Sequence, residues 1–115
     1  MRSTADNYLK AIFECCFLKN RTTNKQVADH LKITPTSVSG VVKKLEKKGL
    51  VYQKPYGPIM LSEQGLQRAL KLMRCFRLCE TWLVRDFNLP LQTIPHQAWM
   101  ISDFDDPQLT NQLND

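Results

Sequence analysis

The fold is decided by one stretch near the middle of the chain, Thr34-Pro35-Thr36-Ser37-Val38-Ser39-Gly40-Val41-Val42-Lys43-Lys44-Leu45-Glu46-Lys47-Lys48-Gly49. It predicts a helix from about Pro35 to Lys48, because Thr34 is a favourable N-cap, proline is tolerated at the first helical position and Gly49 suits the position after the last turn. The apolar side of this helix carries Val38, Val41, Val42 and Leu45, at the spacing i, i+3, i+4 and i+7. The other side carries small and hydroxyl residues followed by lysines, namely Thr36, Ser37, Ser39, Gly40, Lys43, Lys44 and Lys47. We therefore expect one side to pack and the other to face outwards.

The residues around this helix predict two helices before it and a hairpin after it. Residues 4–18 show a helical apolar period, and a short second helix follows Thr23, with Gln26 as its capping-box partner. Lys32-Ile33 forms a tight turn, and the strand-like runs 50–54 and 59–61 flank the rigid tip Pro55-Tyr56-Gly57-Pro58. Helix, short helix, turn, helix and hairpin is the layout of a winged helix-turn-helix.

The second half of the chain predicts further helices. A long helix runs from about residue 63 to 87 after the cap Ser62, a second spans about 91–101, and a short one begins near Pro107. The predicted fold class is mainly α: a winged helix-turn-helix domain with a small two-stranded wing over residues 1–62, then a helical domain over residues 63–115.

Charge and composition narrow the class of protein. The 115 residues carry a net charge of +5, but residues 1–61 hold eleven Lys and Arg against four acids, +7, whereas residues 62–115 hold five against seven, −2. A basic half suggests a polyanionic partner, although an ordinary solvated surface gives the same count. No apolar run is long enough to span a membrane and the first residues do not resemble a signal peptide, so we expect a cytoplasmic protein whose four cysteines are free thiols. No nucleophile–base pair, phosphate loop or carboxylate dyad suggests an enzyme.

The outward side of the 35–48 helix predicts contact with double-stranded DNA. Hydroxyl groups and a helix N-terminus suit base edges and phosphates, and lysines suit phosphates. A glycine on this side permits close approach of the backbone, or is merely tolerated. With the hairpin as a wing, the predicted DNA contacts are Thr34, Thr36, Ser37, Ser39, Gly40, Lys43, Lys44, Lys47, Lys54 and Tyr56.

Several segments resemble the diphtheria-toxin-repressor and manganese-transport-regulator family of metal-dependent regulators. They are Asp6-Asn7-Tyr8-Leu9-Lys10-Ala11-Ile12, Gln26-Val27-Ala28-Asp29-His30-Leu31, Thr36-Ser37-Val38-Ser39, Val42-Lys43-Lys44-Leu45-Glu46-Lys47-Lys48-Gly49-Leu50-Val51, Leu61-Ser62-Glu63-Gln64-Gly65 and Arg77-Leu78-Cys79-Glu80. The resemblance covers nearly the whole chain and weakens after Phe87. It implies a homodimeric repressor that binds a palindromic operator through its winged domain, with Mn(II) or Fe(II) as the cofactor. By this resemblance residues 63–115 are a helical dimerisation domain, a role that fits their apolar stripes, which are too extensive to be buried in so small a monomer.

The positions that hold the metal in this family differ here. The resemblance places its first-helix ligands at Asn7 and Lys10, and its fourth-helix His-x-x-x-Glu pair at Phe76 and Glu80. The fifth-helix set falls on Trp99, Ser102 and Asp103, or after a one-residue shift on His96, Met100, Asp103 and Phe104. Divalent first-row ions need carboxylate, imidazole or thiolate donors. The remaining candidates are Glu80, His96 and Asp103, so we expect the family site to be lost.

The predicted function is therefore a sequence-specific DNA-binding regulator, a repressor of the iron/manganese-dependent type, acting as a homodimer on a palindromic operator. Packing of Phe76 and Trp99 would replace the metal. One alternative retains metal sensing through Glu80, His96 and Asp103, with a contribution from Cys75 or Cys79, which lie four residues apart. Another is a protein-interaction module that has kept the winged fold without DNA binding. The cysteines are otherwise small buried residues, and a redox switch between them lacks the CxxC spacing.

Overall fold

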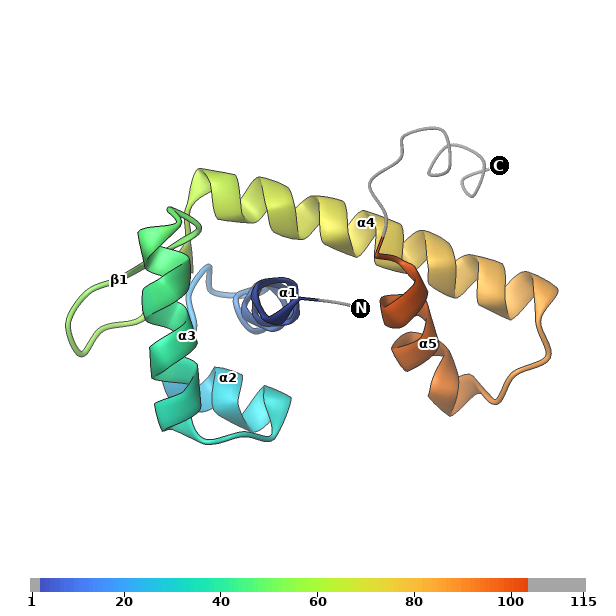
Figure 1. Ribbon diagram of the computed structural model, residues 1–115, viewed down its shortest axis with the longest axis horizontal. Helices are drawn as coiled ribbons and strands as arrows, with labels where there is room; N and C mark the ends of the chain where they lie inside the picture. The colour runs from blue at the N-terminus through green and yellow to red at the C-terminus, as the bar shows by residue number, and fades with distance from the viewer. Residues whose placement is uncertain (1–2, 104–115) are drawn as a thin grey trace. The chain divides into compact units, whose positions relative to one another are not determined.

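The structure, a computed structural model, describes residues 3–103, and these form two compact units that meet in sequence between residues 70 and 71. The elements, shown in Figure 1, are α1 (Thr4–Cys15), α2 (Asn24–Leu31), α3 (Pro35–Lys47), β1 (Val51–Gln53), β2 (Ile59–Leu61), α4 (Glu63–Asp86), the 3₁₀-helix η1 (Leu91–Thr93) and α5 (Ile94–Ile101). Among the helices of residues 3–103, none is both long enough and apolar enough to cross a lipid bilayer. The domain boundary between residues 62 and 63 stays a prediction.

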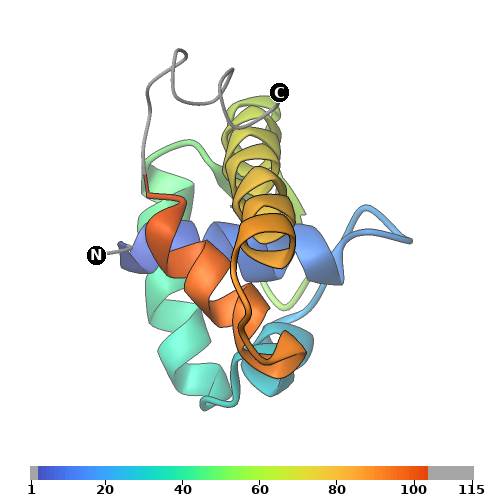
Figure 2. The same ribbon diagram turned by 90° about the vertical axis from the view of Figure 1, so that its right-hand side faces the viewer.

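The core of the first unit lies where α1, α2 and α3 cross. Its fully buried side chains include Leu9 and Ile12 of α1, Val27 of α2, and Val38 and Val42 of α3, each at most 1% exposed. Figure 2 shows α1 in blue running across α3 in green. Burial of these aliphatic side chains supplies most of the driving force for packing the three helices, at about 1.5–3 kcal/mol each before entropy is counted. The predicted valine stripe of α3 is therefore its packed side.

The predicted helix starts are confirmed by their capping bonds. The Thr23 hydroxyl accepts a hydrogen bond from the backbone N–H of Gln26 at 3.1 Å. The Thr34 hydroxyl accepts one from the N–H of Ser37 at 3.3 Å, and α3 ends as predicted before Gly49, whose φ of 76° is left-handed. In α2, Val27 and Ala28 are buried, and Leu31 is half-buried.

The predicted end of the first helix, residue 18, is wrong. α1 ends at Cys15, with Cys16 as its C-cap. The next two side chains, Phe17 and Leu18, are 72% and 88% exposed. Extending the helix over these residues would bury no further apolar surface, so packing gives the helix no reason to continue, and Asn20 takes a left-handed φ of 58° in the connection to α2.

The hairpin forms where it was predicted, with a shorter first strand. β1 and β2 pair antiparallel, with Val51 opposite Leu61 and Gln53 opposite Ile59. Ile59, next to the turn of the hairpin, also forms an isolated antiparallel bridge with Thr22 in the α1–α2 connection. This bridge attaches β2 to the α1–α2 connection, while the wing tip over residues 54–58 projects from the unit (Figure 1).

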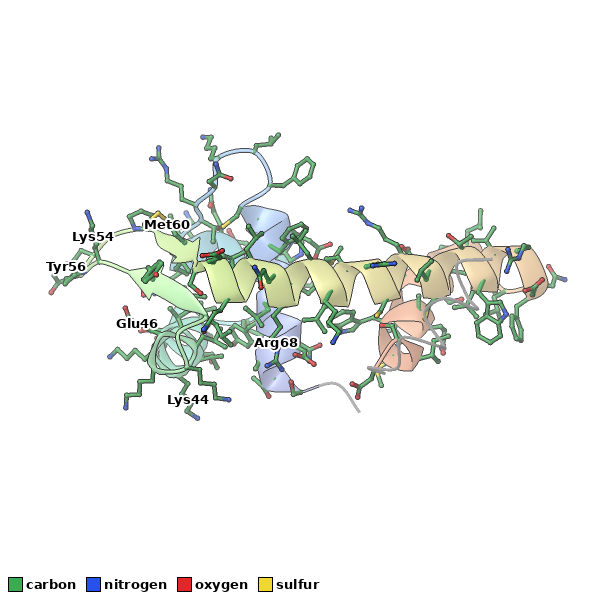
Figure 3. All side chains as sticks on the ribbon, turned by 90° about the horizontal axis from the view of Figure 1, so that it is seen from above. Lys44, Glu46, Lys54, Tyr56, Met60 and Arg68 are labelled. Atoms are coloured by element: carbon green, nitrogen blue, oxygen red, sulfur yellow. The ribbon has the colours of Figure 1, made fainter. Side chains whose placement is uncertain are left out.

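The long helix α4 begins in the first unit and continues into the second. Ser62 is its cap, as predicted, because its hydroxyl accepts a hydrogen bond from the N–H of Gly65 at 2.9 Å. Arg68, labelled in Figure 3, forms a salt bridge between its Nη2 and Oδ1 of the buried Asp6 at 2.9 Å. This bridge and the Ser62 cap attach the first turns of α4 to the winged unit.

The second unit consists of the rest of α4, η1 and α5. The predicted 91–101 helix starts as the 3₁₀-turn η1 and becomes α-helical at Ile94. Two pairs of aromatic rings meet edge-to-face, Phe76 with Trp99 at a centroid distance of 5.8 Å and Trp82 with Phe87 at 4.8 Å. The short helix predicted from Pro107 lies outside the described residues.

Candidate nucleic-acid interface

The outer side of α3 is exposed along its length. Val38, Val42 and Leu45 are buried, whereas the opposite positions are open to solvent except for the half-buried Ser39. The exposed residues on this side are Thr36, Ser37, Gly40, Lys43, Lys44 and Lys47. In Figure 3 the α3 side chains, among them the labelled Lys44, spread away from the helix. The first turn of α3 therefore presents hydroxyl groups, and its later turns present ammonium groups.

Two of the predicted contact residues have a structural role as well. Thr34 and Ser37 lie with their hydroxyl oxygens 2.9 Å apart, and Thr34 also caps the helix through the N–H of Ser37. Both residues are exposed. A hydroxyl that accepts one bond still has a lone pair or proton to offer a phosphate or a base edge. The cap therefore holds both hydroxyl groups at the N-terminal end of α3.

The wing carries Lys54 and Tyr56 at its tip, and both are exposed (Figure 3). Lys54 to Gly57 form a turn in which the N–H of Gly57 donates to the carbonyl of Lys54 at 2.8 Å. Tyr56, at the third turn position, has a φ of 57°, where glycine or asparagine is the usual residue. A tyrosine held in this conformation and left fully in solvent is unusual, and such a backbone position is often associated with function.

A cleft of about 1050 Å³ separates the wing from α2 and α3. Four cationic side chains line it from four different segments, Arg21, Lys25, Lys43 and Lys54, together with one acid, Glu46. Lys43 and Lys54 are among the contacts predicted from the sequence, whereas Arg21 and Lys25 are not. Their position on either side of the α2 N-cap was a usable signal, because the start of α2 lies near the wing in a winged helix-turn-helix.

The three candidate metal ligands do not form a cluster. Glu80 lies half-buried on α4, while His96 and Asp103 are exposed, on α5 and just after it. Within residues 3–103, no group of three or more His, Cys, Asp or Glu side chains is placed to hold a metal ion.

Two of the positions that the family resemblance assigns to metal ligands hold the aromatic pair Phe76 and Trp99, whose rings are in contact. At a third, the Lys10 ammonium forms a salt bridge of 3.0 Å with Glu14. Benzene and indole rings offer no lone pair to a divalent ion, and an ammonium group repels it. The residues present do not fit the metal site of the family.

The cysteines are mostly buried side chains. Cys16, Cys75 and Cys79 are buried, and Cys15 is half-buried. Burial raises the pKa of the Cys16 thiol to about 11, and the neighbouring Cys15 adds to this shift. Burial also raises the pKa of Cys15. A thiol that stays protonated at neutral pH is a poor nucleophile and a poor metal ligand.

The three crossing helices, the exposed basic side of α3 and the wing define the class of winged helix-turn-helix DNA-binding proteins. Within that class, residues 1–59 match the family described as iron-dependent repressor, N-terminal DNA-binding domain, and the chain belongs to this family. Its members are transcriptional regulators, not enzymes. The resemblance seen in the sequence is thus confirmed.

Individual proteins that are similar to this chain are also DNA-binding regulators by name or share its fold. An HTH-type transcriptional regulator of Methanocaldococcus jannaschii is 29% identical over 85% of this chain and 79% of its own length. The HTH-type transcriptional regulator MntR of Listeria monocytogenes is 30% identical over 68% of this chain and 55% of its own length. Among solved structures, the manganese regulator SloR has a TM-score of 0.82 at 27% identity over 99% of this chain and 53% of its own. IdeR of T. acidophilum, at 23% identity, has a TM-score of 0.82 over 98% of this chain and 54% of its own.

These similarities confirm the predicted mainly α, winged-helix fold class. The chain spans about half the length of the solved repressors and of MntR.

Proposed function

We propose that the chain is a sequence-specific DNA-binding transcriptional repressor that acts as a homodimer on a palindromic operator. The observation that carries this proposal is the division of α3 into a buried valine side and an exposed side of hydroxyls and lysines. Family membership supports it. In this proposal α3 enters the major groove with its N-terminal turn towards the bases, and the wing lies along the backbone.

Contact with phosphates falls to the lysines and to the cleft. Lys43, Lys44 and Lys47 extend from the same side of α3, and Arg21 and Lys25 add charge across the cleft. Phosphate contacts supply affinity and register, whereas Thr36, Ser37 and Ser39 are the residues placed to read base edges. Specificity is therefore expected to depend on the first two turns of α3.

The second unit is proposed to pair the protomers. Its helices and the connection after α4 leave large apolar side chains exposed, including Val84 at 59%, Phe87 at 46%, Leu91 at 75% and Ile101 at 42%. Clusters of exposed apolar side chains are uncommon on monomers and typical of interfaces. In a dimer, the two α3 helices can also bind two DNA half-sites that lie about one helical turn apart.

Salt dependence of DNA binding tests the proposal. Binding of the full chain to a mixed-sequence duplex is measured by fluorescence anisotropy between about 50 and 200 mM salt. We expect log K to fall linearly with log salt, and the double variant Lys43→Ala/Lys47→Ala to reduce the slope by about 1.8, since each lost phosphate contact removes about 0.9. Selection from a random duplex library then identifies the operator.

The matched control is Arg74→Ala/Arg77→Ala, which removes the same charge from two exposed positions of α4. It should leave the slope near that of the wild type. Equal slopes for the two double variants would assign binding to net charge alone and contradict the proposal. A wild type that binds no duplex would instead support the alternative of a protein-interaction module.

We further propose that DNA binding does not require a metal at the family position. The edge-to-face contact of Phe76 with Trp99 supports this proposal, because two rings already in contact leave no room for an ion between them. Isothermal titration of the full chain with Mn(II), Fe(II), Co(II) and Zn(II) should show no stoichiometric binding in the micromolar range.

Stoichiometric micromolar binding would contradict this and support the metal-sensing alternative. In that case Glu80→Ala should abolish the heat, and Cys75 and Cys79 variants should lose metal-stimulated DNA binding. Heat that persists in Glu80→Ala would place the ion elsewhere on the chain.

A further inference from the structure

The wing is connected to both α2 and α3 through a single residue, Gln53, the last residue of β1. Its side-chain amide nitrogen donates to Oδ1 of Asn24, at the start of α2, at 3.1 Å. The same nitrogen donates to the carbonyl of Gly57, in the wing turn, at 3.3 Å. Its backbone N–H donates to Oε2 of Glu46, on α3, at 3.3 Å. These three bonds join three elements around the basic cleft.

The chemistry of this arrangement is specific to a primary amide. A primary amide nitrogen carries two hydrogens, and here two acceptors lie within reach of it. Methionine has a similar length and no donor. Glutamate would bring a carboxylate towards the Gly57 carbonyl and the Glu46 carboxylate. The bond to Gln53 also explains why an acid, Glu46, lies in a cleft that is otherwise cationic.

The bond to Gly57 controls the wing tip because the tip is a tight turn. Gly57 donates to Lys54, and a Cβ on Gly57 would lie 3.1 Å from Cβ of Lys54, so the two residues move together. Tyr56 lies between them with a left-handed φ. Fixing the Gly57 carbonyl therefore fixes the direction in which Lys54 and Tyr56 leave the wing.

From these contacts we propose that Gln53 is a positioning residue for DNA binding: it holds the wing at a set distance from α2 and α3, so that Lys54 faces the same duplex backbone as Lys43. Gln53 itself need not touch DNA. This inference rests on the proposed function, because it describes how that binding surface is kept in shape. Without the Gln53 side chain the wing is expected to sample several positions. Part of the binding free energy must then be used to order it, which weakens binding.

The test is a double-variant cycle on the full chain with the mixed-sequence duplex. We expect Gln53→Met to weaken binding about tenfold, because a wing that has lost two hydrogen bonds must be ordered when the protein binds. In the Gln53→Met background, Lys54→Ala should cost less than half of what it costs in the wild type on a logarithmic scale, because its ammonium is no longer held in place. Lys47→Ala, on α3, should cost the same in both backgrounds.

The matched control is Gln67→Met, the same substitution at an exposed position of α4, which should leave the affinity unchanged. A purely structural loss would alter the costs of Lys54→Ala and Lys47→Ala alike, and that result would overturn the inference. So would full additivity of Gln53→Met and Lys54→Ala while the wild type still binds. A wild type without salt-dependent binding would overturn the proposed function itself, which is a distinguishable outcome.

Discussion

The variant Gly65→Ala should lower the stability of the protein by about 3 kcal/mol and its Tm by roughly 10 °C or more. Gly65 lies in the first turn of α4, directly over the peptide of Leu50. A Cβ at this position would overlap the carbonyl oxygen of Leu50 and lie 2.8 Å from its carbonyl carbon. Backbone atoms cannot rotate away as a side chain can, so the start of α4 must shift.

Such a shift would break more than one contact. Ser62 donates through its hydroxyl to the carbonyl of Gly49 at 2.5 Å, and its N–H donates to the carbonyl of Leu50 at 3.0 Å. Both bonds attach Gly49 and Leu50, which follow α3, to Ser62, the cap of α4. Because they surround Gly65, moving the helix by the distance that a methyl group needs would weaken them together.

The matched control is the same substitution in another helix, Gly40→Ala. A Cβ on Gly40 would have no neighbour within 4 Å. Replacing a glycine inside a helix by alanine then gains up to about 1 kcal/mol. Thermal unfolding followed by circular dichroism should show the two variants moving in opposite directions. A Gly65→Ala protein that melts at the wild-type Tm would contradict the close packing of α4 on Leu50.

The helix boundaries were readable from the sequence because their signals are local. Thr23, Thr34 and Ser62 each bond to an N–H three residues ahead, so the capping residue and its partner appear together in the chain. The valine stripe of α3 follows the helical period and needs no knowledge of its partner. The end of α1 was misplaced because it depends on what Phe17 and Leu18 find to pack against, which no local pattern states.

The features that could not be predicted from the sequence depend on contacts between residues that are far apart in the chain. Gln53 and Asn24 lie 29 residues apart, and Asp6 and Arg68 lie 62 apart. Arg21 lines the cleft because Thr22 bridges to Ile59 and brings the α1–α2 connection beside the wing. Nothing local distinguishes Gly65 from Gly40, since both are helical glycines. Only the packing of α4 on Leu50 makes one essential and leaves the other open.

The variant Gly40→Glu should weaken DNA binding about 100-fold while leaving the protein folded. Gly40 lies on the exposed side of α3, between the hydroxyl residues and Lys43 and Lys44. A Cβ built at Gly40 has no atom from outside its own stretch of helix within 4 Å, so an added side chain begins in open space. A carboxylate placed against the phosphates costs several kcal/mol when like charges are juxtaposed, and each 1.4 kcal/mol is a factor of about ten.

Gly40→Gln separates charge from bulk, since it adds the same number of atoms without the negative charge. Anisotropy with the mixed-sequence duplex should give a loss for Gly40→Gln at least tenfold smaller than for Gly40→Glu, with Tm at or above the wild-type value for both. Gln67→Glu adds the same charge on another helix and should have little effect. Equal affinities for Gly40→Glu and Gly40→Gln would mean that no phosphate approaches this side of α3. The lysines would then be an ordinary solvated surface, and the valine stripe would explain packing but not function.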